Sequence, residues 1–246
     1  MKKILLFLFS LYCMIMFLAI MFCIFPFVII ASFFGKVTGG NMINKLCSVW
    51  GKLCTFFWLM PHTNYNKPSN KNDGAVIYVL NHNSYMDIPL MMKIFWDVKI
   101  RVLGKFDLAK VPVFGFIYRK AAILVDRSSP EARAKSILNL KEMLAHNISI
   151  AIYPEGTFNM SNQPLKEFYD GAFKIAIETQ TPIQPVLLLN SLDRLHYDSV
   201  FSFSPGRTKA VFLEQFLPGD DAQLLKEKVF AVMEKGLIEN KVSWIK

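Results

Sequence analysis

Cysteine is scarce in this sequence and is missing from most of it. The four cysteines all lie among apolar residues in the N-terminal quarter: Cys13, Cys23, Cys47 and Cys54. None has the CxxC or Cys/His spacing of a metal site, so the sequence predicts no metal. The rest of the chain offers no thiol for a disulfide or for nucleophilic catalysis. We interpret the four thiols as small apolar side chains in a membrane or interfacial segment.

Several motifs that mark common enzyme classes are also missing. The sequence contains no GxSxG, P-loop, HExxH or GxGxxG pattern, which argues against serine hydrolases, NTPases, zinc proteases and dinucleotide enzymes. Acidic residues number 19 against 28 Lys and Arg, which gives a net charge of +9. That balance suits an anionic membrane surface or a nucleic acid. Because the basic residues are dispersed and no aromatic-interleaved basic motif occurs, we predict no nucleic-acid partner.

The N-terminus holds the longest uncharged stretch of the chain. Residues 4–34 follow two lysines and include no charged side chain. The stretch exceeds both the roughly 7 to 15 residues of a signal-peptide core and the ~20 residues that span a bilayer as a helix. It predicts an uncleaved helical anchor, which Pro26 is able to kink, and which either spans the membrane at a tilt or bends back within it. Lysines on both sides favour cytoplasmic ends, and hence a re-entrant or interfacial anchor.

Residues 41–60 show a different, amphipathic pattern. Apolar side chains recur at spacings of three and four: Leu46, Val49, Trp50, Leu53, Phe56, Phe57 and Met60. The other face carries Lys45, Ser48, Lys52 and Thr55. The pattern favours a helix lying in the membrane interface over a helix docked on a globular core. We predict residues 1–63 as the membrane anchor, residues 64–74, which are polar with Pro and Gly, as a linker, and residues 75–246 as a globular domain.

From residue 75 onward, apolar strand patterns alternate with helical ones. The predicted strands are residues 75–80, 98–103, 121–125, 148–153, 183–189 and 209–214. The predicted helices are residues 88–95, a helix that starts with Ser128 and Glu131 at capping-box spacing, residues 171–179 and residues 221–238. This alternation predicts an α/β fold: a mixed, mostly buried sheet flanked by helices, behind an N-terminal helical membrane anchor.

The polar sequence HNSYMD, residues 82–87, follows the first predicted strand. On a helix, side chains five positions apart point in different directions, so contact between His82 and Asp87 requires a turn. A turn would let the carboxylate accept a hydrogen bond from one ring nitrogen and leave the other nitrogen free to take a proton from a hydroxyl. The spacing therefore predicts a general base. The alternative is a capped turn with a surface histidine.

Three further polar motifs stand where predicted strands end. Residues 153–157, YPEGT, contain a glycine whose neighbours can present N–H groups to an anion, unless the segment is a simple turn. Lys105 follows a glycine after a strand and is either an anion-binding cation or a solvated lysine. Asp126 and Arg127 end a buried run and belong either to the site or to a structural salt bridge.

In this order and behind a hydrophobic anchor, these motifs resemble those of the lysophospholipid acyltransferase family, most of all its bacterial 1-acylglycerol-3-phosphate acyltransferases. His82 to Asp87 matches the H-x4-D block, and residues 153–157 resemble the Phe-Pro-Glu-Gly-Thr block. Residues 122–127, AILVDR, and residues 181–186, TPIQPV, resemble the second and fourth blocks. The similarity covers roughly residues 75–190 and makes residues 75–246 the acyltransferase domain.

The resemblance implies O-acyl transfer without a cofactor or metal. His82, oriented by Asp87, would deprotonate the sn-2 hydroxyl of lysophosphatidic acid, and the oxygen would attack the thioester of acyl-CoA or acyl carrier protein to give phosphatidic acid. Lys105, Arg127 and the Glu155-Gly156-Thr157 loop would position the acceptor. The implied partners are the lysophospholipid, the acyl donor and membrane lipids. The implied location is the bacterial inner membrane, with the catalytic domain on its cytoplasmic face.

One position departs from the family pattern. The third block usually continues with an arginine that is expected to bind phosphate, but the residue here is Phe158. Phenylalanine cannot replace a bidentate guanidinium. Either Lys105, Arg127 or another cation such as Lys166 compensates, or the acceptor is a lyso-amino lipid of the ornithine or glycine type. A non-catalytic lipid-binding member and a hydrolase are further alternatives; the donor type, acyl-chain length and oligomeric state stay open.

Overall fold

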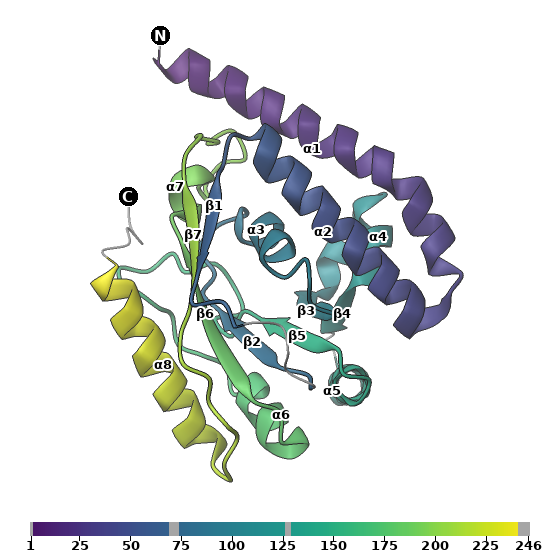
Figure 1. The fold of residues 1–246 in the computed structure, drawn as a ribbon, viewed down its shortest axis with the longest axis vertical. Helices are drawn as coiled ribbons and strands as arrows, with labels where there is room; N and C mark the ends of the chain where they lie inside the picture. Colours follow the sequence, from purple (N-terminus) through teal and green to yellow (C-terminus); the bar gives the residue numbers. More distant parts are fainter. Residues whose placement is uncertain (1, 69–73, 126–128, 241–246) are drawn as a thin grey trace.

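A seven-stranded sheet forms the centre of the protein in the computed structural model, which describes residues 2–68, 74–125 and 129–240 (Figure 1). The strands are β1 His62–Tyr65, β2 Ile77–Leu80, β3 Ile100–Lys105, β4 Ala122–Val125, β5 Ser149–Ile152, β6 Ile183–Leu189 and β7 Thr208–Phe212. Their order across the sheet is β1-β7-β6-β2-β5-β3-β4. Neighbouring strands are parallel except β6 and β7, which are antiparallel. The predicted mixed α/β sheet is thereby confirmed.

Helices cover both faces of this sheet. They are α1 Lys2–Ser32, α2 Gly40–Phe57, α3 Asp87–Ile94, α4 Phe114–Ala121, α5 Pro130–Ala145, α6 Gly171–Thr179, α7 Ser191–Arg194 and α8 Ala222–Glu239, with a π-helical turn η1 Gly35–Gly39 and a 3-10 helix η2 Phe106–Lys110. Figure 1 shows α5, α6 and α8 on one face, and α2, α3 and α4 on the other with α1 outermost. Successive strand residues point to opposite faces, so Val79 joins the core with α5, α6 and α8, whereas Leu80 joins the core with α2 and α3.

The three innermost strands explain why parts of the sequence are such clear strand signals. Every residue of β2, β5 and β6 is buried, so each strand is mainly apolar with little alternation. The sequence does not predict β1, because HTNY has no apolar pattern; that strand forms by pairing with β7 at the sheet edge. Helix α5 has Ser129 as its N-cap, with the hydroxyl accepting the N–H of Ala132 at 3.1 Å. The predicted cap, Ser128, lies outside the described residues.

α1 is one continuous helix with Pro26 inside it. By length and composition, it is the one candidate membrane span among the residues described, Lys3–Ser32. The chain reverses at η1, beyond the end of α1, and not at Pro26. One side of α1 packs on α2 and on the loop after α7, where the Ser10 hydroxyl accepts the N–H of Phe203 at 3.0 Å. The other side leaves large apolar side chains exposed, including Leu8, Ile15, Phe22 and Ile30.

α2 packs between α1 and α3, which corrects the expectation of a helix held mainly by the membrane interface. Its buried apolar side chains are Ile43, Cys47, Trp50 and Cys54. Gly51 permits the close approach of α3, because a Cβ there would lie 2.7 Å from the carbonyl oxygen of Pro89. Ser48 and Thr55 are also buried, and each hydroxyl donates to the carbonyl four residues earlier. Three members of the predicted apolar stripe stay exposed: Val49, Leu53 and Phe56.

Arg101 fastens the turn between α1 and α2 to the sheet. Its buried guanidinium donates to the carbonyl of Val37 at 3.3 Å and to the side-chain oxygen of Asn41 at 2.9 Å. Burial lowers the pKa of Arg101 to about 10, which still leaves the side chain charged at neutral pH. The α1–α2 hairpin is thus joined to β3 by a buried cation.

The division of the chain into an anchor, residues 1–63, and the residues that follow stays a prediction. Strand β1, His62–Tyr65, runs across that boundary.

Candidate active site

His82 and Asp87 meet in the loop that leads from β2 into α3. The ring nitrogen Nδ1 of His82 lies 2.8 Å from Oδ2 of Asp87, and the same oxygen accepts the N–H groups of Asn83 and Ser84 at 2.9 Å each. Asp87 is the first residue of α3, where the helix dipole favours a negative charge. Because an ionised carboxylate can only accept, the Nδ1 atom of His82 carries the proton, and Nε2 is left as the basic nitrogen.

Two aromatic rings pack against the imidazole. The ring centroids of Tyr153 and Phe158 lie 4.3 Å and 4.5 Å from that of His82. The hydroxyl of Tyr153 donates to the backbone carbonyl of Asp87 at 3.2 Å. Burial raises the pKa of Tyr153 well above its usual value, so this hydroxyl stays protonated. The His82 side chain remains 18% exposed, which leaves the imidazole fixed in orientation but open to a substrate.

Glu155 ties the loop after β5 to the loop after β2. One carboxylate oxygen accepts the N–H of His82 at 2.8 Å, and the other accepts the N–H of Lys166 at 2.9 Å. The residue is completely buried, and burial raises its pKa to about 7 while the two N–H groups act in the opposite direction. The family resemblance implies that the loop of Glu155, Gly156 and Thr157 positions the acceptor, and this role stays a prediction. In the structure both carboxylate oxygens of Glu155 accept main-chain N–H groups.

Gly156 and Thr157 lie on the wall of a cavity that also reaches His82. Gly156 has a φ of 70°, and a Cβ there would lie 2.6 Å from the ring of Tyr169. Both the backbone angle and the tight contact therefore require glycine. The hydroxyl of Thr157 accepts a hydrogen bond from the ammonium of Lys166 at 2.9 Å.

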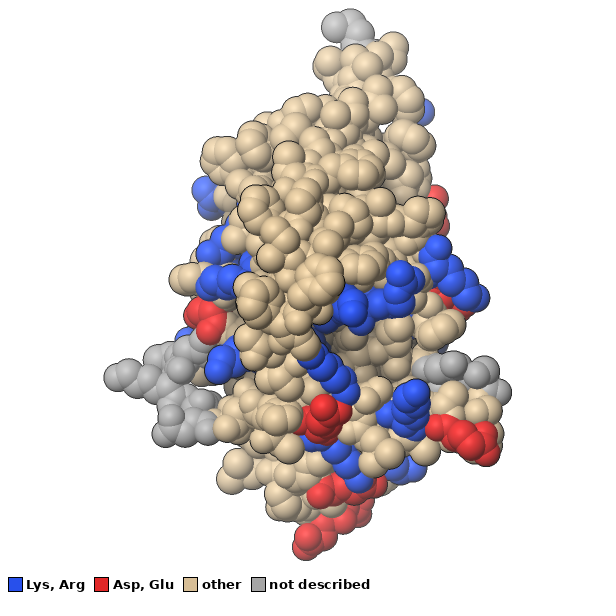
Figure 2. All heavy atoms as spheres, turned by 90° about the vertical axis from the view of Figure 1, so that its right-hand side faces the viewer, with Lys and Arg blue, Asp and Glu red and all other residues tan. Residues whose placement is uncertain are grey.

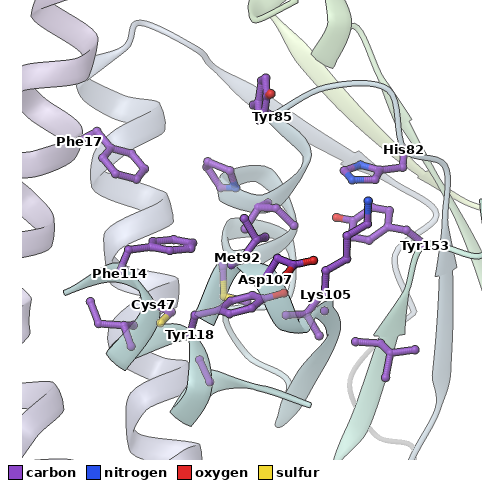
Figure 3. A pocket seen from close by; sticks show the side chains of 18 of the residues that line it. Phe17, Cys47, His82, Tyr85, Met92, Lys105, Asp107, Phe114, Tyr118 and Tyr153 are labelled. Carbon is purple, nitrogen blue, oxygen red and sulfur yellow. The ribbon is translucent and has the colours of Figure 1, made fainter. Parts of the chain in front are cut away.

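Lys105 enters the same cavity from the end of β3. Figure 3 shows its side chain extending toward His82 and Tyr153. The preceding glycine makes room for Tyr118, because a Cβ at Gly104 would lie 1.8 Å from the Tyr118 hydroxyl. Arg127, also predicted to contact the acceptor, lies outside the described residues. The structure therefore brings together His82, Asp87, Lys105 and the Gly156-Thr157 segment.

The cavity has a volume of about 1270 Å³ and continues from His82 to the N-terminal helices. Its far wall consists of apolar side chains from α1: Met14, Phe17, Leu18, Met21 and Ile24. Figure 3 shows Phe17 and Phe114 across the cavity from His82. Among the described residues, no group of three His, Cys, Asp or Glu could hold a metal ion. The sequence does not predict this use of α1, because the apolar composition of the helix is the same whether it lines a cavity or faces lipid.

Comparison with known proteins gives consistent results. The family model described as Acyltransferase matches residues 62–189, more than half of the chain. A 1-acyl-sn-glycerol-3-phosphate acyltransferase of Helicobacter pylori is 27% identical over 190 residues, which cover 77% of this chain and 79% of that protein. One of Salmonella typhimurium is 29% identical over 203 residues, covering 79% and 78%. The crystal structure of the 1-acyl-sn-glycerophosphate (LPA) acyltransferase PlsC from Thermotoga maritima matches the whole of both chains with a TM-score of 0.79 and 22% identity, so the fold is shared.

Proposed function

Because this chain belongs to the acyltransferase family, we propose that it is a membrane-bound enzyme that transfers a fatty acyl group to the sn-2 hydroxyl of lysophosphatidic acid. The product is phosphatidic acid. The observation that carries the proposal is the contact of 2.8 Å between His82 and Asp87 at one end of a large, mainly apolar cavity. Two bacterial relatives named 1-acyl-sn-glycerol-3-phosphate acyltransferase support this choice of acceptor.

The reaction begins when Nε2 of His82 removes the proton from the acceptor hydroxyl. The resulting oxygen attacks the carbonyl carbon of the thioester, in acyl-CoA or acyl carrier protein, and the new ester C–O bond replaces the C–S bond. The thiolate leaves and takes the proton that the imidazolium now carries. Asp87 stabilises the imidazolium throughout, and no covalent acyl-enzyme forms. The mechanism needs no cofactor and no metal.

The apolar part of the cavity suits a fatty acyl chain. A chain enclosed by α1, α2 and α4 is removed from water, and each buried CH2 group contributes about 0.8 kcal/mol. The wall from α1 lies opposite the imidazole, so a chain extending from the reacting carbonyl would run toward the helical hairpin. This arrangement supports an acyl chain that is held while its thioester carbonyl stays next to His82.

The surface around the hairpin suits the cytoplasmic face of a bacterial inner membrane. Figure 2 shows a broad area without charged side chains on the side where α1, α2 and α4 lie, bordered by Lys and Arg, with most of the visible Asp and Glu farther away. On α2, the ammonium groups of Lys52 and Lys45 lie 3.5 Å and 4.6 Å from the ring centre of Trp96. An exposed tryptophan beside lysines, next to apolar side chains, is typical of a membrane interface.

A second acceptor class is favoured by Phe158. Its ring contacts His82 and also Tyr85, with centroids 4.8 Å apart for the latter pair. Aromatic faces attract organic cations, so the amine of a lyso-amino lipid of the ornithine or glycine type would fit beside them. Such an enzyme would keep the same O-acyl transfer and change only the acceptor.

The test is a comparison of acceptors with the full-length chain in membranes. Labelled lysophosphatidic acid and lyso-amino lipids are each supplied with acyl-CoA or acyl carrier protein. We expect phosphatidic acid from the wild-type chain and none from His82→Ala at equal expression. Full activity of that variant would refute the role of His82. Acylation of lyso-amino lipids alone would favour the second acceptor class, and no turnover with any pair would favour a non-catalytic lipid-binding protein.

A further inference from the structure

Two lysines form no ion pair with a carboxylate in the described part of the chain: Lys105, which lines the cavity, and Lys166, which contacts the cavity-lining Thr157. Most other lysines for which contacts are seen form ion pairs: Lys36 with Glu142, Lys67 with Asp97, Lys110 with Asp107, Lys141 with Glu178, Lys174 and Lys226 with Asp170, and Lys235 with Glu239. A cation without a paired carboxylate can neutralise a bound anion. The two lysines therefore give this end of the cavity a positive charge that is available to a substrate.

The main chain brings Lys166 back to Thr157, which lines the cavity. Glu155 accepts its backbone N–H at 2.9 Å, and within the intervening segment the side chain of Asn159 donates to the carbonyl of Gln163 at 2.9 Å. Asn159 is buried, and its own N–H donates to the carbonyl of His82 at 2.7 Å. The segment is thus closed into a loop whose two ends meet at Glu155. The side chain of Lys166 then reaches Thr157, whose hydroxyl accepts from its ammonium at 2.9 Å.

The side chain of Phe158 cannot bind an anion. Its ring packs against His82 and Tyr85 and offers no donor to an anion. The side chain at position 158 therefore packs against the imidazole. The nearest cation on this loop is the ammonium of Lys166, which donates to the hydroxyl of Thr157, the residue before Phe158.

We propose that Lys166, held by Thr157, binds the phosphate of the acceptor in place of an arginine at position 158. This inference rests on the proposed function, because it assumes a phosphate-bearing acceptor. An ammonium has three N–H donors, so two remain for phosphate oxygens after the bond to Thr157. A phosphate monoester carries a charge between about −1.5 and −2 at neutral pH, which Lys105 and Lys166 together can match.

The experiment compares two acceptors that differ only in the phosphate: lysophosphatidic acid and 1-acylglycerol of the same chain length. In Lys166→Ala we expect kcat/KM for lysophosphatidic acid to fall about tenfold or more, since hydrogen bonds to charged groups contribute that much. The value for 1-acylglycerol should stay within about twofold. The control is Lys174→Ala, which removes an equal charge from an exposed ion pair with Asp170 and should leave both values unchanged. The backbone bond from Lys166 to Glu155 survives the substitution.

A second variant tests whether the two positions serve the same group. Adding Phe158→Arg to Lys166→Ala should raise the ratio of kcat/KM values, lysophosphatidic acid over 1-acylglycerol, back toward that of the wild type. An equal loss for both acceptors in Lys166→Ala would overturn the proposal, because it would indicate a structural role. No loss for either acceptor would overturn it as well.

Binding separates failure of this inference from failure of the proposed function. In the His82→Ala background, the affinity for lysophosphatidic acid should fall about tenfold or more when Lys166→Ala is added. If the wild-type chain does not turn over lysophosphatidic acid but this difference in affinity is found, the proposed reaction fails and the phosphate site stands. If turnover occurs and neither affinity nor kcat/KM depends on Lys166, the phosphate site fails and the reaction stands.

Discussion

Glu155 accepts the backbone N–H of His82 at 2.8 Å. The proposed general base, His82, is therefore held from two directions: Asp87 contacts its ring, and Glu155 accepts its main-chain N–H. The second oxygen of Glu155 reaches Lys166, so one buried carboxylate joins the imidazole loop to the loop that carries the proposed phosphate-binding cation.

The buried carboxylate of Glu155 gives stability a defined dependence on pH. Burial raises its pKa from 4.5 to about 7, so between these values the folded state binds more protons than the unfolded state. The free energy of unfolding should therefore fall as pH rises through this window, by at most about 1.4 kcal/mol per pH unit. Denaturation in detergent between pH 4.5 and pH 8 measures this, and Glu155→Gln should lack the slope. Parallel curves for the two proteins would contradict the assignment.

The orientation of His82 by Asp87 predicts a large effect on turnover. Asp87→Asn preserves the shape of the side chain but lets its amide donate, which favours the wrong tautomer of the imidazole. We expect kcat to fall by about 10³-fold or more. Expression and the denaturation midpoint, measured alongside, control for folding. A loss below about tenfold in kcat would show that the carboxylate does not set the tautomer.

The positive φ of Gly156 predicts that even a methyl group is harmful there. Alanine would need a backbone angle that L-residues rarely adopt, and its Cβ would meet the ring of Tyr169. We expect Gly156→Ala to lower the free energy of unfolding by about 1–3 kcal/mol and to reduce activity. Gly171→Ala is the matched control, because a Cβ there meets nothing within 4 Å. Equal stability of the two variants would refute the strain.

The lysines beside Trp96 predict a preference for anionic membranes. Each lysine near a negatively charged surface contributes about 1 kcal/mol, so the double variant Lys45→Ala, Lys52→Ala should bind vesicles that contain phosphatidylglycerol roughly 30-fold less tightly. Flotation of the detergent-diluted chain with these vesicles and with neutral phosphatidylcholine vesicles measures the effect. Lys141→Ala, Lys235→Ala removes the same charge elsewhere. Equal weakening by both pairs would assign the effect to net charge alone.

The parts of the fold that the sequence predicts well are those where local pattern and burial agree. β5 and β6 are buried, mainly apolar strands whose positions the sequence pattern predicts, and contact between His82 and Asp87 at their spacing requires a turn. β1 is different, since its polar sequence becomes a strand only because β7 supplies the hydrogen bonds. The buried position of Ser48 is also hidden, because its hydroxyl is satisfied within its own helix.

The direction of a side chain in the site is the hardest feature to predict. Glu155 belongs to a recognisable motif, yet only the folded loops show that its two oxygens accept main-chain N–H groups. Lys166 stands well after that motif, and its approach to Thr157 depends on the loop whose two ends meet at Glu155. Sequence spacing identifies which residues gather in such a site, whereas tertiary contacts decide what each of them touches.

The contact of Arg101 with the turn between α1 and α2 determines how far this protein can be shortened from its N-terminus. A chain that begins at the linker would lose the wall of the cavity formed by α1 and α2. It would also leave the guanidinium of Arg101 without the carbonyl of Val37 and the side chain of Asn41. Removing the hydrophobic N-terminus would thus produce an incomplete fold rather than a soluble enzyme. Biochemical work on this chain therefore has to begin with detergents, nanodiscs or native membranes.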